Sequence, residues 1–449
     1  MDSDAVIREK KRQQRAWYLF DFGNSAYAAV ILLAVYSAYF QNGVVGGTEG
    51  TRLWGFSLGA AMLVVAILTP ILGTIADYSA YKKQFLFLFS AVCWVFTALL
   101  FFVQKGDILS GMIFFILAEI GYRGGQVFYN ALLHDIAEPE EMSRVSGNGW
   151  AIGCIGGIVC LLFILPPIVL TKKDPSLNLL IVRAAPAFTA LFFALSSLPL
   201  FLRVRERNGS HALPPGENYL TLAFRRLKET ILAVRQFREF VKFIFSFLIY
   251  NDGILMALNF ASIIGIVLFG MNQTQLILFM IVVQVTSAAG AYLFGLMSER
   301  CGCKPSLILS LVLMIFIVVW MVFNQTIWGY FVIGALAGFA LTGVQSLSRT
   351  MTGLFVPEQK STEFFSFFAI AGKSSSFIGP LAFGGLAFRV SQILEKYGYD
   401  PTSAAKMGYR AGLGLIVIFL LVGLLVFLSV NEKKARQAAV QTAPASGNE

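Results

Sequence analysis

Long apolar stretches recur along this sequence and restrict it to a fold inside a lipid bilayer. The chain has 449 residues, of which 57% are hydrophobic and only 13% are charged. Because a soluble domain carries about 25% charged residues, an ordinary soluble fold is excluded. Runs of about 20 apolar residues suffice to cross about 30 Å of hydrocarbon. They occur at twelve places, which are residues 17–41, 53–75, 84–104, 108–133, 145–170, 180–202, 240–269, 274–297, 305–323, 328–350, 363–388 and 408–430. We therefore predict an all-α membrane protein with twelve transmembrane helices.

A motif of a glycine, an acid and a lysine occurs twice, each time between two apolar stretches. Its members are Gly73, Asp77 and Lys82 in the first copy, and Gly295, Glu299 and Lys304 in the second. The acid follows the glycine by four residues, and the lysine follows the acid by five, in both copies. The copies lie about half a chain apart. Such a duplication is typical of secondary transporters built from two related halves.

The duplication predicts two pseudo-symmetric six-helix bundles, at residues 1–203 and 240–431. Between them, residues 204–239 form a cytoplasmic linker. Apolar and basic residues alternate from Tyr219 to Phe240, which predicts an amphipathic helix on the membrane surface. Residues 432–449 are polar and rich in alanine, and we predict that they form a disordered cytoplasmic tail.

The basic residues gather on one side of the predicted bundle. The N-terminal tail, the loop after the sixth span, the C-terminal tail and both glycine–acid–lysine motifs fall on that side. Positive charge marks the cytoplasmic face, so we predict a multi-pass protein with both termini in the cytoplasm, in the plasma or inner membrane if it is bacterial. The loop between the last two spans is an exception, since it carries Arg389, Lys396, Lys406 and Arg410. The net charge of +10 therefore indicates membrane topology rather than a nucleic-acid partner.

Several segments resemble a known family. The two glycine–acid–lysine motifs are similar to the cytoplasmic loop motif of the major facilitator superfamily. Residues 17–27 are similar to the first span of its vacuole-effluxer-like branch, which includes the fungal autophagy-related vacuolar amino-acid effluxer. Further segments that resemble this branch are residues 128–131, 144–147, 250–253, 345–349, 363–367 and 372–373. The first loop motif departs from the family pattern, because Tyr78, Ala80 and Tyr81 replace an arginine, a glycine and a basic residue.

This resemblance implies a twelve-helix transporter that works by alternating access, with spans one, four, seven and ten lining a central cavity. It also gives the loop motifs a role in gating. Glycine lets two helices approach closely, and an acid at a helix end pairs with bases or with the N-terminus of another helix. The gating residues that we predict are Asp21, Gly73, Asp77, Lys82, Gly295, Glu299, Arg300 and Arg349. The alternatives are that the lysines only supply cytoplasmic charge, that Asp21 binds substrate, and that Arg349 only snorkels.

Ionisable groups inside membrane spans are the sharper signal, since each costs about 2.5–3.5 kcal/mol to insert. Glu119 and Arg123 lie one helical turn apart in the fourth span and so share a face. Arg123 is predicted to bind a substrate carboxylate or phosphate, while Glu119 competes for it and accepts a proton as the substrate leaves. The other substrate-binding residues that we predict are Asn24, Ser25, Gln126, Asn251, Asp252, Gln345 and Lys373. The alternatives are a neutral Glu119–Arg123 pair that only aids insertion, and a packing role for Asp252.

The sequence also excludes other classes of protein. It has no phosphate-binding glycine loop, which argues against direct drive by ATP. His134 and Asp135 lack a serine or cysteine nucleophile, so we predict no enzymatic activity. Cys301 and Cys303 have no partner cluster, so we predict neither a metal site nor a disulfide framework, and no cofactor.

These features together predict a monomeric secondary active transporter for a small polar metabolite. An amino acid is the first substrate to test, and a proton is the expected coupling ion. An organic-anion or nucleotide-like carrier is the alternative among transporters, because Arg123, Arg349 and Lys373 would make the cavity positive. The alternative from another class is a membrane receptor or a lipid scramblase on the same fold.

Overall fold

The computed structural model describes residues 3–78, 81–137, 139–206, 218–235, 237–355, 367–368, 371–372 and 376–441. These residues are almost entirely helical and contain no strand. Among them, eleven helical segments are long and apolar enough to cross a membrane. The predicted span at 363–388 lies partly outside the described residues, and most of its described part is the start of α15 (Ile378–Lys396).

The contacts divide the chain into two compact units. Unit 1 comprises Met1–Ala223, Phe260–Ile266 and Met271–Ile281, and unit 2 comprises the rest. The long helices that lie wholly in unit 1 are α1 (Ser3–Tyr27), α3 (Gly47–Tyr78), α4 (Lys82–Leu99), α5 (Ile108–Ala131), α7 (Pro139–Leu170) and α8 (Pro175–Arg203). Those of unit 2 are α10 (Arg238–Phe269), α11 (Gln273–Cys301), α12 (Cys303–Phe323), α13 (Ile327–Leu354), α15 and α16 (Pro401–Leu428), with parts of α10 and α11 belonging to unit 1.

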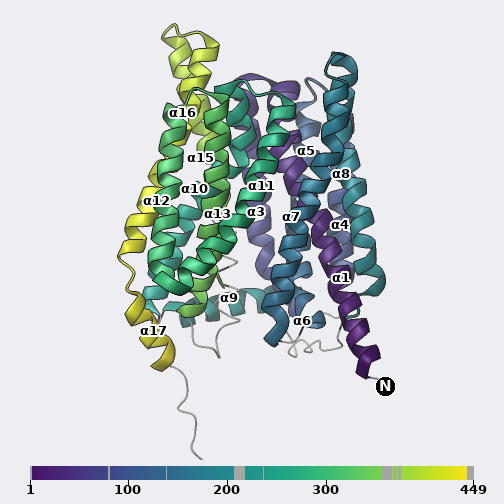
Figure 1. Ribbon diagram of the computed structural model, residues 1–449, viewed down its shortest axis with the longest axis vertical. Coiled ribbons are helices and arrows are strands. Elements are labelled where there is room, and N and C mark those ends of the chain that lie inside the picture. The colour runs from purple at the N-terminus through teal and green to yellow at the C-terminus, as the bar shows by residue number, and fades with distance from the viewer. Residues whose placement is uncertain are drawn as a thin grey trace, which may run out of the picture. The chain divides into compact units, whose positions relative to one another are not determined.

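Small residues let the helices of unit 1 pack closely. Helix α1 packs on α7 and α8, and α4 packs on α5 and α8 (Figure 1). A side chain at Gly156 would place its Cβ 2.0 Å from the Phe22 carbonyl oxygen, and one at Gly121 would lie 2.6 Å from the Cys93 backbone nitrogen. These two glycines therefore set the separation of α1 from α7 and of α4 from α5.

The first span is not one continuous α-helix. Directly after Tyr27 it continues as the π-helix η1 (Ala28–Ala34), then as α2 (Tyr36–Tyr39), and then as a second π-helix, η2 (Phe40–Val45). Two tyrosines of this region anchor it, since Tyr36 donates to the Gly111 carbonyl over 3.2 Å and Tyr39 to the Val103 carbonyl over 2.9 Å. Short π-helices concentrate at functional sites, which draws attention to the residues just before η1.

In unit 2, α12 packs on α13 and α16, and α15 packs on α16. Hydroxyl groups tie these helices together. Tyr250 of α10 and Ser348 of α13 lie 2.7 Å apart, oxygen to oxygen, and Ser246 donates to the Gly423 carbonyl over 2.7 Å. Asp400 caps the start of α16, and the backbone N–H of Ser403 holds the pKa of that carboxyl below its usual range.

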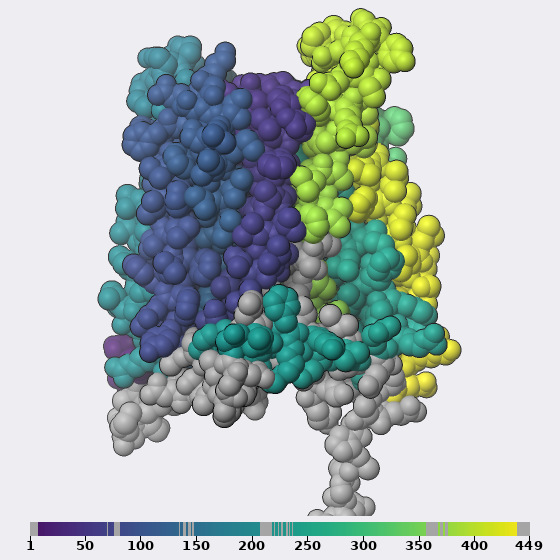
Figure 2. Space-filling view, turned by 180° about the vertical axis from the view of Figure 1, so that it is seen from behind, coloured from purple at the N-terminus to yellow at the C-terminus, as the bar shows by residue number. Residues whose placement is uncertain are grey.

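Two further helices are short and amphipathic. Helix α9 (Tyr219–Arg235) runs across the direction of α10 (Figure 1), and its outer face is uncovered in Figure 2. The exposed side chains of α9 include two apolar ones, three basic ones and one acidic one, which are Phe224, Leu232, Arg225, Lys228, Arg235 and Glu229. The second is α17 (Glu432–Gln441), where the sequence analysis predicts disorder. Glutamate, lysine and alanine are strong helix formers, and Arg436 pairs with Glu432 one turn earlier, so this segment forms a helix.

Candidate functional site

A buried ion pair lies in the middle of α5. The Arg123 Nε atom donates to Glu119 Oε1 over 2.7 Å, across one helical turn. The Glu119 side chain is fully buried, whereas 23% of the Arg123 side chain remains exposed. The arginine side of the pair is therefore partly open, whereas the carboxylate side is closed. The sequence prediction that these two side chains share a face is confirmed by this contact.

Aromatic rings support the pair. The Arg123 guanidinium lies 5.3 Å from the centre of the Tyr122 ring, and the Tyr27 ring stacks on Tyr122 at 4.6 Å with an interplanar angle of 27°. The faces of aromatic rings attract cations, so Tyr122 stabilises Arg123 in this position. The end of α1 is thereby joined to the middle of α5 at the point where η1 begins.

One oxygen of the buried carboxylate has no partner in the described part of the chain. It is Glu119 Oε2, and the hydroxyl group of Tyr27 likewise lacks a hydrogen bond there. The Tyr27 hydroxyl group lies within interaction distance of the Glu119 carboxyl group, and the Cys93 thiol of α4 lies nearby with its sulfur 3.8 Å from Thr97 Oγ1. Buried polar groups are normally hydrogen-bonded, so the missing hydrogen bonds of Glu119 Oε2 and the Tyr27 hydroxyl group need a chemical explanation.

Three predicted residues of the first span lie on the same side of unit 1. Asp21 and Ser25 face α7, where a Cβ at Gly153 would lie 2.8 Å from Asp21 Oδ2 and 2.7 Å from Ser25 Oγ. Asn24 is buried beside Asp21, and the Asp21 carboxylate is near enough to Tyr122 to interact with it electrostatically. The structure thus places these residues close together on α1, with Asp21 near the tyrosine that supports Arg123.

The remaining predicted binding residues are placed as follows. Gln126 is half-buried, one turn beyond Arg123 on α5. In unit 2, Asp252 is buried on α10 with its carbonyl oxygen beside Gly379 of α15, and Asn251 is half-buried. On α13, Gln345 is half-buried and Arg349 is exposed. Lys373 lies outside the described residues.

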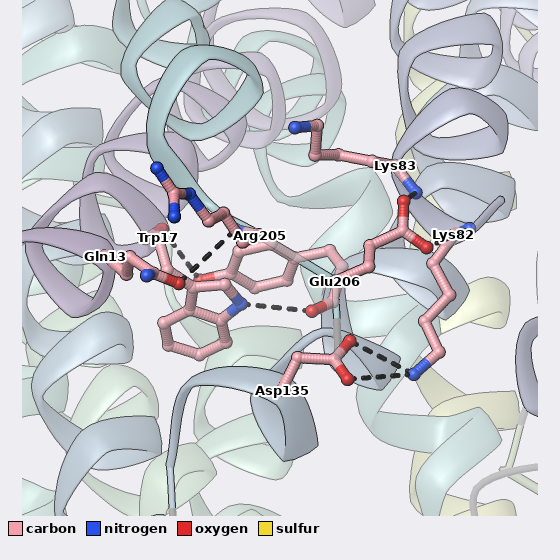
Figure 3. Close-up of polar contacts among 8 residues, drawn as sticks. Gln13, Trp17, Lys82, Lys83, Asp135, Arg205 and Glu206 are labelled. Atoms are coloured by element: carbon pink, nitrogen blue, oxygen red, sulfur yellow. Dashed lines mark hydrogen bonds and ion pairs between the residues drawn. The ribbon is translucent and has the colours of Figure 1, made fainter. Parts of the chain in front are cut away.

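A polar network joins the helix ends of unit 1 on the side where α1 begins (Figure 3). The Lys82 amine donates to both oxygens of Asp135, over 3.1 and 3.3 Å. Glu206, just beyond α8, accepts the backbone N–H groups of Lys82 and Lys83 over 3.0 and 2.9 Å. A carboxylate at this position satisfies two free donors and faces the positive end of α4. The predicted gating lysine is therefore bound within its own unit.

The first span is fixed to the same network by a tryptophan. The Trp17 indole donates to the Tyr129 carbonyl over 3.0 Å, and the two rings stack at 4.3 Å with an angle of 6°. The Tyr129 hydroxyl donates in return to the Trp17 carbonyl over 3.3 Å. The Arg205 backbone N–H donates to Gln13 Oε1 over 3.3 Å (Figure 3). Helices α1, α4, α5 and α8 are thus tied together at this end.

The lysine of the second motif has a similar structural role in unit 2. The Lys304 amine donates to the Val430 carbonyl over 2.6 Å and to the Leu428 carbonyl over 3.3 Å, at the end of α16. In unit 1, the Lys83 amine donates to the Val204 carbonyl over 2.9 Å, at the end of α8. Each lysine is the second residue of its helix. The motif spacing pairs Lys304 with Lys82. The contacts instead pair Lys304 with Lys83, the next residue, because both donate to carbonyl groups at a helix end.

The other members of the motifs make few contacts. A Cβ at Gly73 or Gly295 would meet no described atom within 4 Å, and Glu299 and Arg300 are exposed. The side chain of Asp77 lies outside the described part of the chain. The gating role of these residues stays a prediction.

We expect the Lys82–Asp135 pair to be energetically coupled. Asp135 is nearly buried, with 6% of its side chain exposed, and Lys82 has 18% exposed. A double-mutant cycle with Lys82→Met and Asp135→Asn should give a coupling free energy of about 0.5–3 kcal/mol in unfolding experiments in detergent. The exposed Arg225–Glu229 pair, 3.7 Å apart, is the control and should give less than about 1 kcal/mol. Equal values for the two pairs would contradict the structural role of Asp135.

The sequence matches a known family of membrane proteins. The family model described as "Vacuole effluxer Atg22 like" matches residues 51–440. The chain belongs to this family. An uncharacterized MFS-type transporter of Bacillus subtilis, YxiO, is 28% identical over 382 residues, which cover 84% of this chain and 88% of the relative. Autophagy-related protein 22 of Coccidioides immitis is 21% identical over 433 residues, covering 80% of this chain and 71% of the relative.

Solved structures show the same fold. A bacterial homologue of the human lysosomal transporter Spinster aligns with a TM-score of 0.69 at 15% identity, covering 99% of this chain and all of that one. The nucleoside transporter NupG aligns with a TM-score of 0.69 at 12% identity, covering 93% of this chain and all of that one. The Atg22-like chain therefore has the major facilitator fold. It is an integral, multi-pass membrane transporter for a small molecule and not an enzyme.

Proposed function

We propose that this Atg22-like protein is a secondary active transporter that moves a small metabolite bearing a carboxylate, with an amino acid as the first candidate. The observation that carries this proposal is the buried Glu119 paired with the partly exposed Arg123 inside a membrane span. A charged pair at this depth is costly to insert, and such pairs usually mark a substrate or ion pathway. A pair that only aided insertion would not need to leave part of one side chain exposed.

The chemistry of Arg123 favours an anionic group as its ligand. A guanidinium presents five N–H donors in a planar fork, and Glu119 takes the Nε–H. A solute carboxylate that accepts two of these donors competes with Glu119 for the same cation. Nearby, Asn24 and Ser25 supply polar groups suited to the rest of a zwitterion. From the second half of the chain, the proposed substrate-binding residues are Asn251, Asp252, Gln345 and Lys373.

We further propose that a proton is the coupling ion. Glu119 is a carboxyl group that competition by substrate would leave without its cation, which favours uptake of a proton. A solved structure with the same fold is that of a D-xylose–proton symporter, with a TM-score of 0.65 at 13% identity, which supports a proton as the coupling ion.

The basic helix ends and the exposed basic face of α9 support cytoplasmic termini, with α9 lying on the inner leaflet. The glycine–acid–lysine motifs are proposed to gate this face.

Counterflow in vesicles tests the function. We expect purified protein in liposomes loaded with one amino acid at millimolar concentration to accumulate traces of the same radiolabelled amino acid, and a panel of solutes to identify the substrate. An organic-anion panel run in parallel tests the alternative cargo, which the exposed Arg349 favours. Absence of counterflow for every solute, with lipid exchange between leaflets instead, would reject the carrier in favour of a scramblase.

A further inference from the structure

The Tyr27 hydroxyl group and Glu119 Oε2 form a matched pair of buried polar atoms. Tyr27 is 1% exposed and Glu119 is fully buried. The Tyr27 hydroxyl group lies close enough to the Glu119 carboxyl group for the two to interact, although neither the hydroxyl oxygen nor Glu119 Oε2 has a hydrogen bond of good geometry within the part of the chain that the structure describes. The Tyr27 ring cannot turn away freely, because it is stacked on Tyr122 immediately before the π-helix η1. The carboxyl group thus has Oε1 on a cation, whereas Oε2 is available for a hydrogen bond with the neighbouring hydroxyl group.

A hydroxyl group suits a carboxyl group that gains and loses a proton. Arg123 has only donors, so it stabilises the ionised carboxylate alone. A tyrosine hydroxyl donates to an ionised carboxylate and accepts from a protonated one. A buried carboxyl oxygen without either kind of partner is costly in both states. Tyr27 is the residue in this pocket of unit 1 that answers both requirements.

We propose that Glu119 carries the coupling proton on Oε2 and that Tyr27 is its positioning partner. In the ionised state Tyr27 donates to Oε2. When a substrate carboxylate takes Arg123, an aqueous proton binds Oε2, and the new O–H group donates to the Tyr27 oxygen. Return of Arg123 to Glu119 releases that proton. This rests on the proposed transport function, and it places proton uptake with substrate binding rather than with substrate release.

The other groups around the carboxyl group fit this role. Arg123 pairs with the carboxyl group directly, and the Asp21 carboxylate interacts with the neighbouring Tyr122. Cys93 of α4 and Tyr122 of α5 are ordinarily uncharged near neutral pH. The charge of the pocket is therefore set by Glu119, Arg123 and Asp21. Occupation of Arg123 by substrate shifts the balance towards protonated Glu119.

Two variants in liposomes test the proposal. Glu119→Gln should lose accumulation driven by a pH gradient at every pH tested, because it mimics the protonated carboxyl group permanently. Tyr27→Phe should keep counterflow and move the pH midpoint of driven accumulation upward by about 0.5–1 unit. The sign follows because the hydrogen bond to the ionised carboxylate is the stronger of the two that are lost. Tyr36→Phe is the matched control, since its buried hydroxyl bonds the Gly111 carbonyl, and its midpoint should not move.

A second measurement is independent of substrate. Infrared difference spectra between acidic and alkaline protein in detergent should contain a carboxylic-acid C=O band that disappears in Glu119→Gln and shifts in Tyr27→Phe. Driven accumulation by Glu119→Gln at the wild-type level, or an unshifted band in Tyr27→Phe, would overturn the proposal. Counterflow that is absent already in the wild type instead rejects the transport function, so the two failures are distinguishable.

Discussion

Replacement of Arg123 by glutamine should be the most damaging single change in unit 1. Glu119 is fully buried, and Arg123 is the cation that touches it. Breaking a buried ion pair on one side costs about 3–5 kcal/mol, because the remaining charge has no partner and no water. We therefore expect the free energy of unfolding of Arg123→Gln to fall by that amount at neutral pH. Thermal or urea unfolding of the purified protein in detergent measures it.

The double variant Glu119→Gln with Arg123→Gln separates stability from binding. It removes both charges, so most of the lost stability should return, while carboxylate binding should stay absent in a thermal-shift assay with the transported solute. Arg183→Gln is the matched control. The Arg183 Nε atom donates to the Phe101 carbonyl over 3.1 Å, and its loss should cost only about 0.5–1.5 kcal/mol. If Arg123→Gln and Arg183→Gln were equally stable, Glu119 would not be a buried charge.

The parts of this structure that follow from the sequence are those set by local spacing. The length of each apolar run predicts a span, because the bilayer fixes how many residues a helix needs to cross it. The Glu119–Arg123 contact was predictable for a similar reason, since residues four apart on a helix are neighbours. Family resemblance predicted the fold, and the comparisons confirm it.

The parts that the sequence does not reveal depend on contacts between distant segments. Glu206 caps α4 from more than a hundred residues away, and the sequence analysis assigns it no role. From the sequence, Asp135 is considered only as a catalytic residue, and that role is rejected because no nucleophile accompanies it. In the structure, Asp135 forms an ion pair with Lys82. Tyr27 lies within the segment that carries the family resemblance, but its position opposite Glu119 depends on how α1 packs on α5. The π-helix that follows, Ala28–Ala34, contains no proline or glycine that would signal it.

Adding one methyl group at Gly156 should also have a large effect. The new Cβ would lie 2.0 Å from the Phe22 carbonyl oxygen, which belongs to the backbone of α1 and cannot rotate away. Helices α1 and α7 would have to separate, and overpacking of this kind costs about 1–3 kcal/mol or more. We expect Gly156→Ala to lower the unfolding temperature or the yield of folded protein. Size-exclusion profiles and thermal unfolding in detergent provide the measurement.

Gly73→Ala is the matched control and also tests the gate. A Cβ at this position would have no described atom within 4 Å, so the structure leaves room for the methyl group, and alanine favours the helix by up to about 1 kcal/mol. Its stability should therefore equal or exceed that of the wild type. If gating requires a close approach at Gly73 in another state of the cycle, this stable variant should still transport slowly. Wild-type transport by Gly73→Ala would mean that the first motif acts through Lys82 and Lys83 as a structural anchor, and that its glycine has no part in gating.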